Sequence, residues 1–378
     1  MILNDFQNTI LKKFDKQIYF SKVLIWEECP LRCKYCFVDK ESENVIRLET
    51  LYRYIDLLLF SPWNVKLLHL LWWEPLLHKD ILKKWVLYAR KVQKFLWKDL
   101  TISFCTSWLL FDEDILKFVL ENDIKLAWSI DWPQHIHDDM RISKTWAWTY
   151  KNAIKHKHKV FWLVPDRNLW LAIVVSNKFE IANNLFESFK YLVEEEWFTS
   201  MQISSADGEP WSKASFRVFI KNYIKIHEYI LENIEKWKKF IYLNTMNKEF
   251  RYWLLSTLRH EEWRCIWFYT DCWVNWDVVF DPFVHKDDMH SRNHVAWNVN
   301  SETFIDDVSE YIWCKYKQNS MNCINCHKKY FSKISINNHV LKYRDEVTLF
   351  FANKIRKLAE TNKIYRDYID EAKEQMYV

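Results

Sequence analysis

Glycine is almost absent from this chain, whose 378 residues include 1 Gly and 23 Trp. Average usage of about 7% would give about 26 glycines. Tryptophan stands in turn-like strings where glycine is the fitting residue, as in Asn275-Trp276-Asp277 and Ala296-Trp297-Asn298. Glycine adopts φ > 0 without steric cost, whereas a residue with a Cβ atom does not. We infer that the sequence as written carries tryptophan where its functional parent has glycine, and that its motifs belong to that parent.

Other features are missing as well, and each absence excludes a class of protein. The net charge of +4 is small and no block of Lys and Arg is long, so the sequence makes no strong case for a nucleic-acid partner. The N-terminus has no basic start, long apolar stretch or small-residue cleavage site, so we expect no signal peptide and no membrane span. Nine cysteines in such a chain indicate reduced, metal-binding thiols and a cytoplasmic protein.

Between residues 20 and 235, short apolar runs alternate with amphipathic stretches of helical length. This order is typical of successive βα units and a parallel sheet. The predicted helices span residues 48–60, 79–96, 112–122, 178–196 and 212–236. The predicted strands span residues 23–25, 66–71, 100–104, 124–127, 171–175 and 200–203. Six such units fit a partial (β/α)6 barrel, although the spacing alone also allows a doubly wound sheet; either fold places a site at the carboxyl ends of the strands.

Three cysteines follow the first predicted strand in the run Cys29-Pro-Leu-Arg-Cys33-Lys-Tyr35-Cys36-Phe37. A [4Fe-4S] cluster usually takes four thiolates, so three leave one iron with an open position for chemistry. A zinc site or three unrelated core thiols is the alternative. Zinc knuckles, however, pair two C-x2-C units closely, and no second unit lies nearby.

This run resembles the signature of radical S-adenosylmethionine (radical SAM) enzymes. The resemblance implies that Cys29, Cys33 and Cys36 hold a catalytic [4Fe-4S] cluster, that SAM chelates its open iron, and that Tyr35 and Phe37 lie beside these cofactors. One electron then cleaves SAM into methionine and a 5′-deoxyadenosyl radical. The partial (β/α)6 barrel is the fold that this resemblance implies.

A second motif follows the second predicted strand. With glycines restored, Trp72-Trp73-Glu74-Pro75 resembles the family loop that holds the SAM amino group. A bare backbone and a carboxylate approach an ammonium group closely, whereas two indoles would fill that space. A solvated loop acid is the alternative interpretation of Glu74.

A third motif, Cys105-Thr106-Ser107-Trp108, follows the third predicted strand and resembles the family turn near the SAM carboxylate and ribose. Short hydroxyls such as those of Thr106 and Ser107 can donate hydrogen bonds to a carboxylate. A plain turn is the alternative. We expect Cys105 to be a buried thiol rather than a ligand.

The most specific of these strings after the cysteines begins at Ser129-Ile-Asp131-Trp132-Pro and continues through Ile-His137-Asp to Arg141. With glycine at 132 it resembles a string of radical SAM enzymes that modify peptides and proteins. In that family Ser129 and Asp131 would contact SAM, and Arg141 would pair with its carboxylate. We expect His135 and His137 to be surface or supporting residues rather than metal ligands.

Cysteines recur beyond the predicted barrel, and the segment from Cys272 to Asp277 resembles the strand-turn segment of SPASM or twitch domains, which hold auxiliary [4Fe-4S] clusters. We expect one auxiliary cluster on four of five thiols, with structural zinc as the alternative. The candidates are Cys265, Cys272, Cys314, Cys323 and Cys326, of which the first and the last two are the firmest choices. The predicted division is an N-terminal segment (1–19), a radical SAM barrel (20–236), a cysteine-rich domain (237–332) and a helical tail (333–378).

The resemblance therefore implies an oxidoreductase that abstracts hydrogen from a side chain of a peptide or protein, as a maturase of ribosomal peptides does. An anaerobic sulfatase-maturing type of enzyme is the alternative within the family. A non-catalytic scaffold that binds zinc or an inert cluster is the alternative outside it. The implied partners are the peptide or protein substrate and a cytosolic electron donor such as a flavodoxin or ferredoxin. A nucleic acid or a membrane is not among them.

Overall fold

The computed structural model of the chain describes the strands and helices that surround the predicted site. The described residues are 3–13, 18, 20–23, 28–36, 46–62, 64–70, 74–131, 133–206, 211–236, 240–247, 269–272, 277–279, 295–298 and 337–374. Predictions that concern other residues, among them Phe37, Trp72, Trp73, Cys265, Cys314, Cys323 and Cys326, lie outside these ranges.

One sheet organises the molecule, and its strand order is β10-β9-β8-β1-β2-β3-β4-β5-β6-β7. Each neighbouring pair from β8 through β1 to β7 is parallel, whereas β8, β9 and β10 pair antiparallel. The bounds are β1 Phe20–Val23, β2 Val65–Leu70, β3 Asp99–Thr106, β4 Ile124–Ser129, β5 Leu169–Val175, β6 Ser200–Ser205, β7 Tyr242–Leu243, β8 Tyr269–Cys272, β9 Asp277–Val279 and β10 Val295–Asn298.

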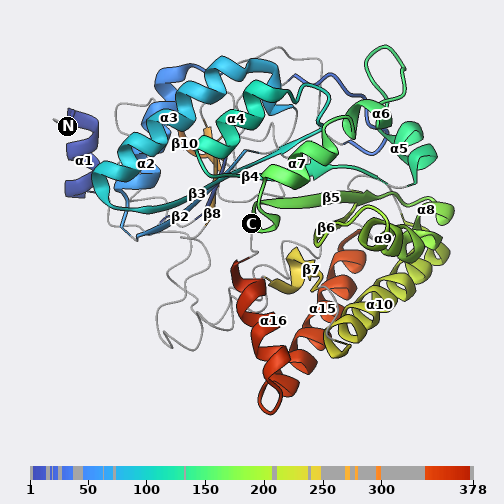
Figure 1. Ribbon diagram of the computed structural model, residues 1–378. Coiled ribbons are helices and arrows are strands. Elements are labelled where there is room, and N and C mark those ends of the chain that lie inside the picture. The colour runs from blue at the N-terminus through green and yellow to red at the C-terminus, as the bar shows by residue number, and fades with distance from the viewer. Residues whose placement is uncertain are drawn as a thin grey trace.

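Helices connect the parallel strands and cover the outer side of the sheet; α2, α3 and α4 lie together along one half, and α9, α10, α15 and α16 gather at the other (Figure 1). Their bounds are α1 Asp5–Lys13, α2 Leu48–Phe60, α3 Lys79–Leu96, α4 Glu113–Glu121, α5 Gln134–Met140, α6 Tyr150–Ala153, α7 Lys157–Leu163, α8 Phe179–Asn183, α9 Leu185–Glu194, α10 Lys213–Glu235, α15 Asn337–Ala359 and α16 Lys363–Glu374, with short 3-10 turns η1 Pro75–His78 and η2 Asp166–Asn168.

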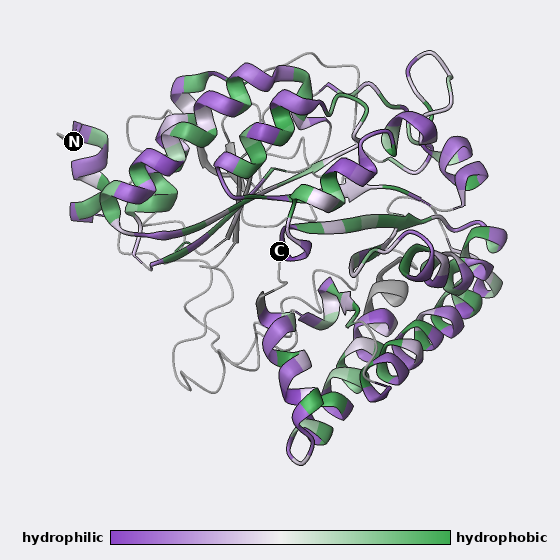
Figure 2. Ribbon diagram, viewed as in Figure 1, coloured by the Kyte–Doolittle hydropathy of each residue, from purple (hydrophilic) through white to green (hydrophobic). Residues whose placement is uncertain are grey.

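Alternating side-chain direction along β2 explains why the helices pack on this side of the sheet. Leu68 and Leu70 of β2 belong to the main hydrophobic core with the apolar faces of α2 and α3, and those helices carry hydrophilic residues on their other side (Figure 2). His69, between them, points to the inner face, where its Nδ1 lies 2.6 Å from the Ser103 hydroxyl of β3. The helix-facing side of the sheet is therefore apolar, and polar groups remain on the inner side.

The structure confirms the predicted α/β class and parallel sheet. Helices α2 and α3 begin and end at the predicted residues. The helix predicted over 178–196 is two helices, α8 and α9, because Asn184 ends the first and begins the second. The C-terminal tail also forms two helices. In α15, Ile355 is fully buried, whereas Phe350 is 64% exposed, so the packed face of this helix includes Ile355 and not Phe350.

Tryptophan occupies most of the left-handed backbone positions. Among the described residues, five non-glycine residues have positive φ, and four of them are tryptophans: Trp97, Trp108, Trp146 and Trp197. Trp97 follows α3 as its C-cap with φ 54°, a position that usually takes glycine. Trp108 is buried, and its indole N–H has no hydrogen-bond acceptor among the described residues. These positions support the inference that glycine is the fitting residue there.

Candidate functional site

The loop with three cysteines lies across the carboxyl ends of the parallel strands, held to the segment that follows α5. The Arg32 amide donates to the Ile142 carbonyl (2.7 Å), the Lys34 amide donates to the Met140 carbonyl (2.9 Å), and the Lys144 amide donates to the Pro30 carbonyl (2.8 Å). These backbone bonds join the two segments in an antiparallel manner, with a bridge at Leu31. The position of the cysteine loop is therefore set by residues 140–144.

The three cysteines are free thiols, as ligands of an iron-sulfur cluster must be. Cys29 is buried, Cys33 and Cys36 are half-buried, and none of them forms a disulfide. The Cys36 amide donates to the Cys33 carbonyl in a tight turn (3.0 Å). No three His, Cys, Asp or Glu side chains among the described residues converge on a site for a single ion. A four-iron cube binds each thiolate to a different iron, so its ligands need not converge on one point.

Asp131, at the carboxyl end of β4, is the centre of a buried polar network. Its carboxylate accepts a hydrogen bond from the Tyr35 hydroxyl (2.7 Å), two from Arg141 (2.9 and 3.2 Å) and one from the Val174 amide of β5 (3.1 Å). The Arg141 guanidinium also lies over the Tyr35 ring, 5.4 Å from its centroid. The network thus ties the cysteine loop to the ends of β4 and β5.

The charges in this network explain the protonation states of its members. Burial alone would lower the pKa of the Arg141 guanidinium, but the attraction of Asp131, Tyr35 and Cys33 and the hydrogen bond to Asp131 together outweigh it and raise this pKa above the ordinary value. Burial raises the pKa of the Tyr35 hydroxyl well above 10, so this group stays a hydrogen-bond donor. Arg141 also interacts electrostatically with Cys33. A neighbouring cation favours the thiolate form, which is the form that binds metal.

Glu74 joins the ends of β2 and β3. Its carboxylate accepts hydrogen bonds from the Thr106 hydroxyl (2.7 Å), the Ser107 amide (2.8 Å), the Leu76 amide (3.1 Å) and the Ser107 hydroxyl. Burial raises the pKa of this carboxyl group, and the four hydrogen bonds oppose that rise. In this arrangement Thr106 and Ser107 hold Glu74, which limits what they can offer a ligand; their predicted contact with SAM stays a prediction.

His137 and Asp138 hold the loop that follows Arg141 against the Asp131 network. The His137 Nδ1 accepts from the Asp131 amide (3.2 Å), and its Nε2 lies 3.2 Å from the Thr149 hydroxyl, which donates to the Arg141 carbonyl. Burial and then Arg141 lower the pKa of His137 to about 4, so the ring is neutral. Asp138 accepts from the amides of Thr149 and Tyr150 (2.9 and 2.8 Å). These two side chains therefore fix the loop from Arg141 to Thr149. From the sequence we expect a surface or supporting role for His135 and His137, and His135 is exposed, whereas no role is predicted for Asp138.

The remaining predicted residues also lie at the strand ends. The Ser129 hydroxyl is 3.0 Å from the Cys105 sulfur, and the side chain of Cys105 is half-buried rather than buried as the sequence predicts. Pro75 begins η1 and is buried. Cys272 ends strand β8, beside Val23 of β1. The Arg141 guanidinium is engaged with Asp131, and its predicted pairing with the SAM carboxylate stays a prediction.

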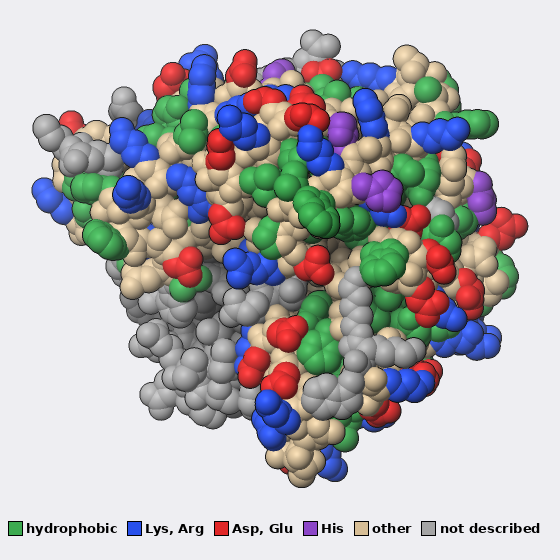
Figure 3. All heavy atoms as spheres, in the orientation of Figure 1, with side chains coloured by type: hydrophobic (Ala, Val, Ile, Leu, Met, Phe, Trp, Pro, Cys, Tyr) green, Lys and Arg blue, Asp and Glu red, His purple; other side chains and the backbone are tan. Residues whose placement is uncertain are grey.

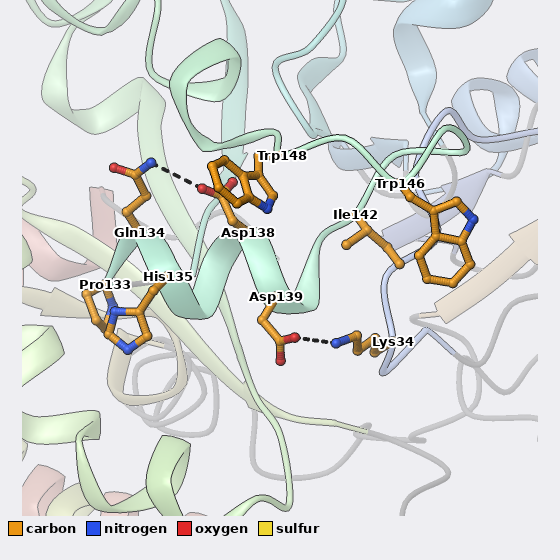
Figure 4. A pocket seen from close by; sticks show the side chains of 9 residues that line it. All are labelled: Lys34, Pro133, Gln134, His135, Asp138, Asp139, Ile142, Trp146 and Trp148. Carbon is orange, nitrogen blue, oxygen red and sulfur yellow. Dashed lines mark hydrogen bonds and ion pairs between the residues drawn. The ribbon is translucent and has the colours of Figure 1, made fainter.

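A cleft of about 640 Å³ lies on the outer side of the cysteine loop (Figure 4). Lys34, which stands between Cys33 and Cys36, forms one wall and pairs with Asp139 of α5. Trp146 and Trp148, from the loop held by Asp138, form another wall and are 75% and 78% exposed. The cleft thus lies between α5, the loop that carries the two tryptophans, and Lys34 of the cysteine loop.

Comparisons with known proteins agree with this geometry. Residues 23–162 match the family model of the Radical SAM superfamily. No curated protein matches the sequence. Among solved structures, a histidine-tagged form of anSMEcpe with bound AdoMet has a TM-score of 0.68 at 16% identity, and the match covers 94% of this chain and 98% of that one. Streptococcus suis SuiB bound to the precursor peptide SuiA has a TM-score of 0.54 at 12% identity, with 80% and 67% covered.

The three cysteines, the Glu74 loop and the Asp131 network all lie within residues 23–162, which match the Radical SAM superfamily, and the predicted resemblance to that superfamily is confirmed. The two structural neighbours, at their low identity, confirm the barrel fold. None of the described helices is long and apolar enough to cross a bilayer.

Proposed function

We propose that this chain is a radical SAM enzyme that modifies a side chain of a peptide or protein. The observation that carries the proposal is the backbone pairing of residues 30–34 with 140–144, which holds Cys29, Cys33 and Cys36 over the ends of strands that carry the Glu74 and Asp131 networks. A [4Fe-4S] cluster with SAM at its open iron would supply reductive cleavage of SAM and a 5′-deoxyadenosyl radical.

The residues of this chain would hold, orient and shield those cofactors. The three thiolates are the ligands, and the buried Arg141 beside Cys33 offsets part of their negative charge. Tyr35, Asp131 and Arg141 keep the cysteine loop in register with β4 and β5, whereas Glu74 fixes the neighbouring ends of β2 and β3. Such preorganisation keeps the ligands from reorienting during the reaction and excludes water from the site.

The substrate class rests on the structural neighbours. Structures of anSMEcpe hold the Kp18Cys peptide, and SuiB holds its precursor peptide SuiA. By analogy, we propose a peptide or protein substrate and the maturation of a small ribosomal peptide, with sulfatase-type maturation as the second candidate. An auxiliary cluster in a SPASM or twitch-like domain, on thiols from Cys265 to Cys326, is part of the same proposal. We also propose that the protein is cytoplasmic and receives electrons from a soluble donor protein.

Anaerobic reconstitution tests the proposal. The protein is loaded with iron and sulfide, and its metal content and the 5′-deoxyadenosine formed from SAM with dithionite are measured beside a version with glycine at 72, 73 and 132. We expect product at least from the glycine version, because bare backbone leaves room for the SAM amino group. Replacement of Cys33 by alanine in that version should abolish product and remove iron. A folded, iron-loaded glycine version without product would instead favour a metal-binding scaffold.

A further inference from the structure

We propose that the basic surface of α6 and α7, together with the cleft beside Lys34, is the docking site of an acidic one-electron carrier protein that reduces the cluster. The proposal rests on the function proposed above, because it needs a cluster on the three cysteines. It assigns a role to a surface that neither SAM nor a substrate inside the barrel would occupy.

The segment that forms this surface carries charged side chains of one sign, and two of its lysines are not paired with acids from the described neighbouring segments. Residues 142–165 contain five lysines and no Asp or Glu. Lys and His side chains gather over α6 and α7 on the face shown in Figure 3. Lys151 and Lys155 are exposed and form no ion pair with any described residue, whereas Lys144, Lys157 and Lys159 pair with Glu28, Glu196 and Glu113. A surface of this kind attracts acidic proteins and raises their association rate.

Backbone hydrogen bonds connect this surface to the cysteine loop. Lys144 begins the basic stretch, and its amide is bonded to Pro30 at the start of that loop. Asp138 fixes the amides of Thr149 and Tyr150, so that α6 starts directly beside α5. A partner seated on α6 and α7 would therefore stand beside the backbone that holds the thiolates.

The cleft brings the partner close to the cluster ligands. Lys34 lies between two of the cysteines, and its side chain is 40% exposed at the wall of the cleft. Asp139, which lines the cleft, is paired with both Lys34 and Lys178, so it does not leave the cleft negative. Asp138 is buried against amide groups.

An acidic electron carrier fits these observations better than an acidic peptide. A peptide substrate must reach the SAM radical at the inner side of the strands, whereas an electron only has to reach the cluster. The carrier is oxidised by one electron and the cluster is reduced by one, with no atom transferred. A short path through the Lys34 loop serves that step, and the outer position of the cleft does not serve hydrogen abstraction.

The test measures docking directly, with a purified flavodoxin as the acidic carrier. Binding of oxidised flavodoxin to the reconstituted protein is followed by flavin fluorescence at several NaCl concentrations. A Lys151→Glu/Lys155→Glu variant should raise the Kd about tenfold or more and flatten its salt dependence. The matched control, Lys213→Glu/Lys221→Glu, reverses two exposed lysines of α10 and should leave the Kd unchanged.

A second measurement separates docking from chemistry. Formation of 5′-deoxyadenosine is driven either by reduced flavodoxin or by dithionite, a small reductant that needs no docking surface. We expect the Lys151/Lys155 variant to lose flavodoxin-driven product and to keep dithionite-driven product. Equal loss of binding in both variants, or unchanged binding in the first, overturns the docking site. No product with dithionite in any form, including the glycine version, would overturn the proposed function, while the binding data would still decide the docking site.

Discussion

The two ends of the barrel both bury charged side chains, yet they satisfy them differently. At the amino-terminal end, Lys66 of β2 is fully buried and donates to the carbonyls of Ile18 and Pro62 (2.6 and 2.8 Å) and to both oxygens of Ser61, the residue that caps α2. Arg90 of α3 similarly donates to carbonyls at the end of α4 and to the Leu100 carbonyl. These cations meet neutral backbone groups, which include the negative ends of helices.

At the carboxyl-terminal end, Asp131 and Glu74 follow β4 and β2, and they accept hydrogen bonds from groups of β3, β5, the cysteine loop and the loops between them. Comparison of the two ends shows that the buried cations of the amino-terminal end hold helices against the sheet. The buried carboxylates of the carboxyl-terminal end instead hold loops in place relative to one another. Removal of the Asp131 carboxylate at the second end leaves the Arg141 guanidinium buried without its anion, which is the more costly defect. The predictions below test this contrast.

The largest effect is expected for Asp131→Asn. This change keeps the size of the side chain but leaves the Arg141 guanidinium, which is 7% exposed, without its anion. Breaking a buried ion pair costs about 3–5 kcal/mol of unfolding free energy. Urea unfolding of the purified protein measures the loss. Asp139→Asn is the matched control, since that carboxylate also pairs with cations but is 49% exposed, and it should cost about 1 kcal/mol or less.

The sequence predicts which strand ends carry the site but not which groups pair there. The order of apolar runs and the cysteine spacing locate Cys29, Glu74 and Asp131 because each follows a strand, and parallel strands end at one edge. Pairing depends on side-chain directions in three dimensions. For this reason Thr106 and Ser107, which the resemblance places near SAM, are engaged with Glu74, and Arg141 is engaged with Asp131. The residue types of segments 30–34 and 140–144 do not predict that the two segments pair through their backbones.

The next effect is a loss of stability in acid. The pKa of His137 is lowered from 6.5 to about 4, and burial lowers the pKa of His227 in α10 to about 4 as well. The unfolded chain therefore binds more protons between these values, so stability is complete above about pH 6.5 and falls as the pH decreases toward 4. Each histidine accounts for about 3 kcal/mol over this window.

Urea unfolding at a series of pH values measures this loss. A His137→Gln variant should show a shallower fall of unfolding free energy between pH 6.5 and 4, because one titrating group is gone while His227 remains. An unchanged slope would contradict a neutral His137 at the carboxyl-terminal end.

A smaller effect is expected for Lys66→Met at the amino-terminal end. The methionine fills the apolar stem but removes the ammonium group, leaving the carbonyls of Ile18 and Pro62 without this donor. We expect a loss of about 2 kcal/mol of unfolding free energy. Iron content after reconstitution should equal that of the unchanged protein, because none of the cysteines that the structure describes lies at this end of the barrel. Reduced iron at equal folded fraction would mean that the two ends are coupled.

The smallest effect compares two exposed tryptophans that differ in backbone conformation. Trp97, 91% exposed, ends α3 in the left-handed region at the amino-terminal end of β3, whereas Trp162, 88% exposed, lies within α7 and is not among the positive-φ residues. Replacement by glycine should therefore stabilise the protein by about 1 kcal/mol at position 97 and destabilise it by up to about 1 kcal/mol at position 162. Thermal unfolding measures both changes in stability. Changes of opposite sign would show that backbone strain at position 97 causes the difference, whereas changes of the same sign would show that exposure of the indole ring determines stability at both positions.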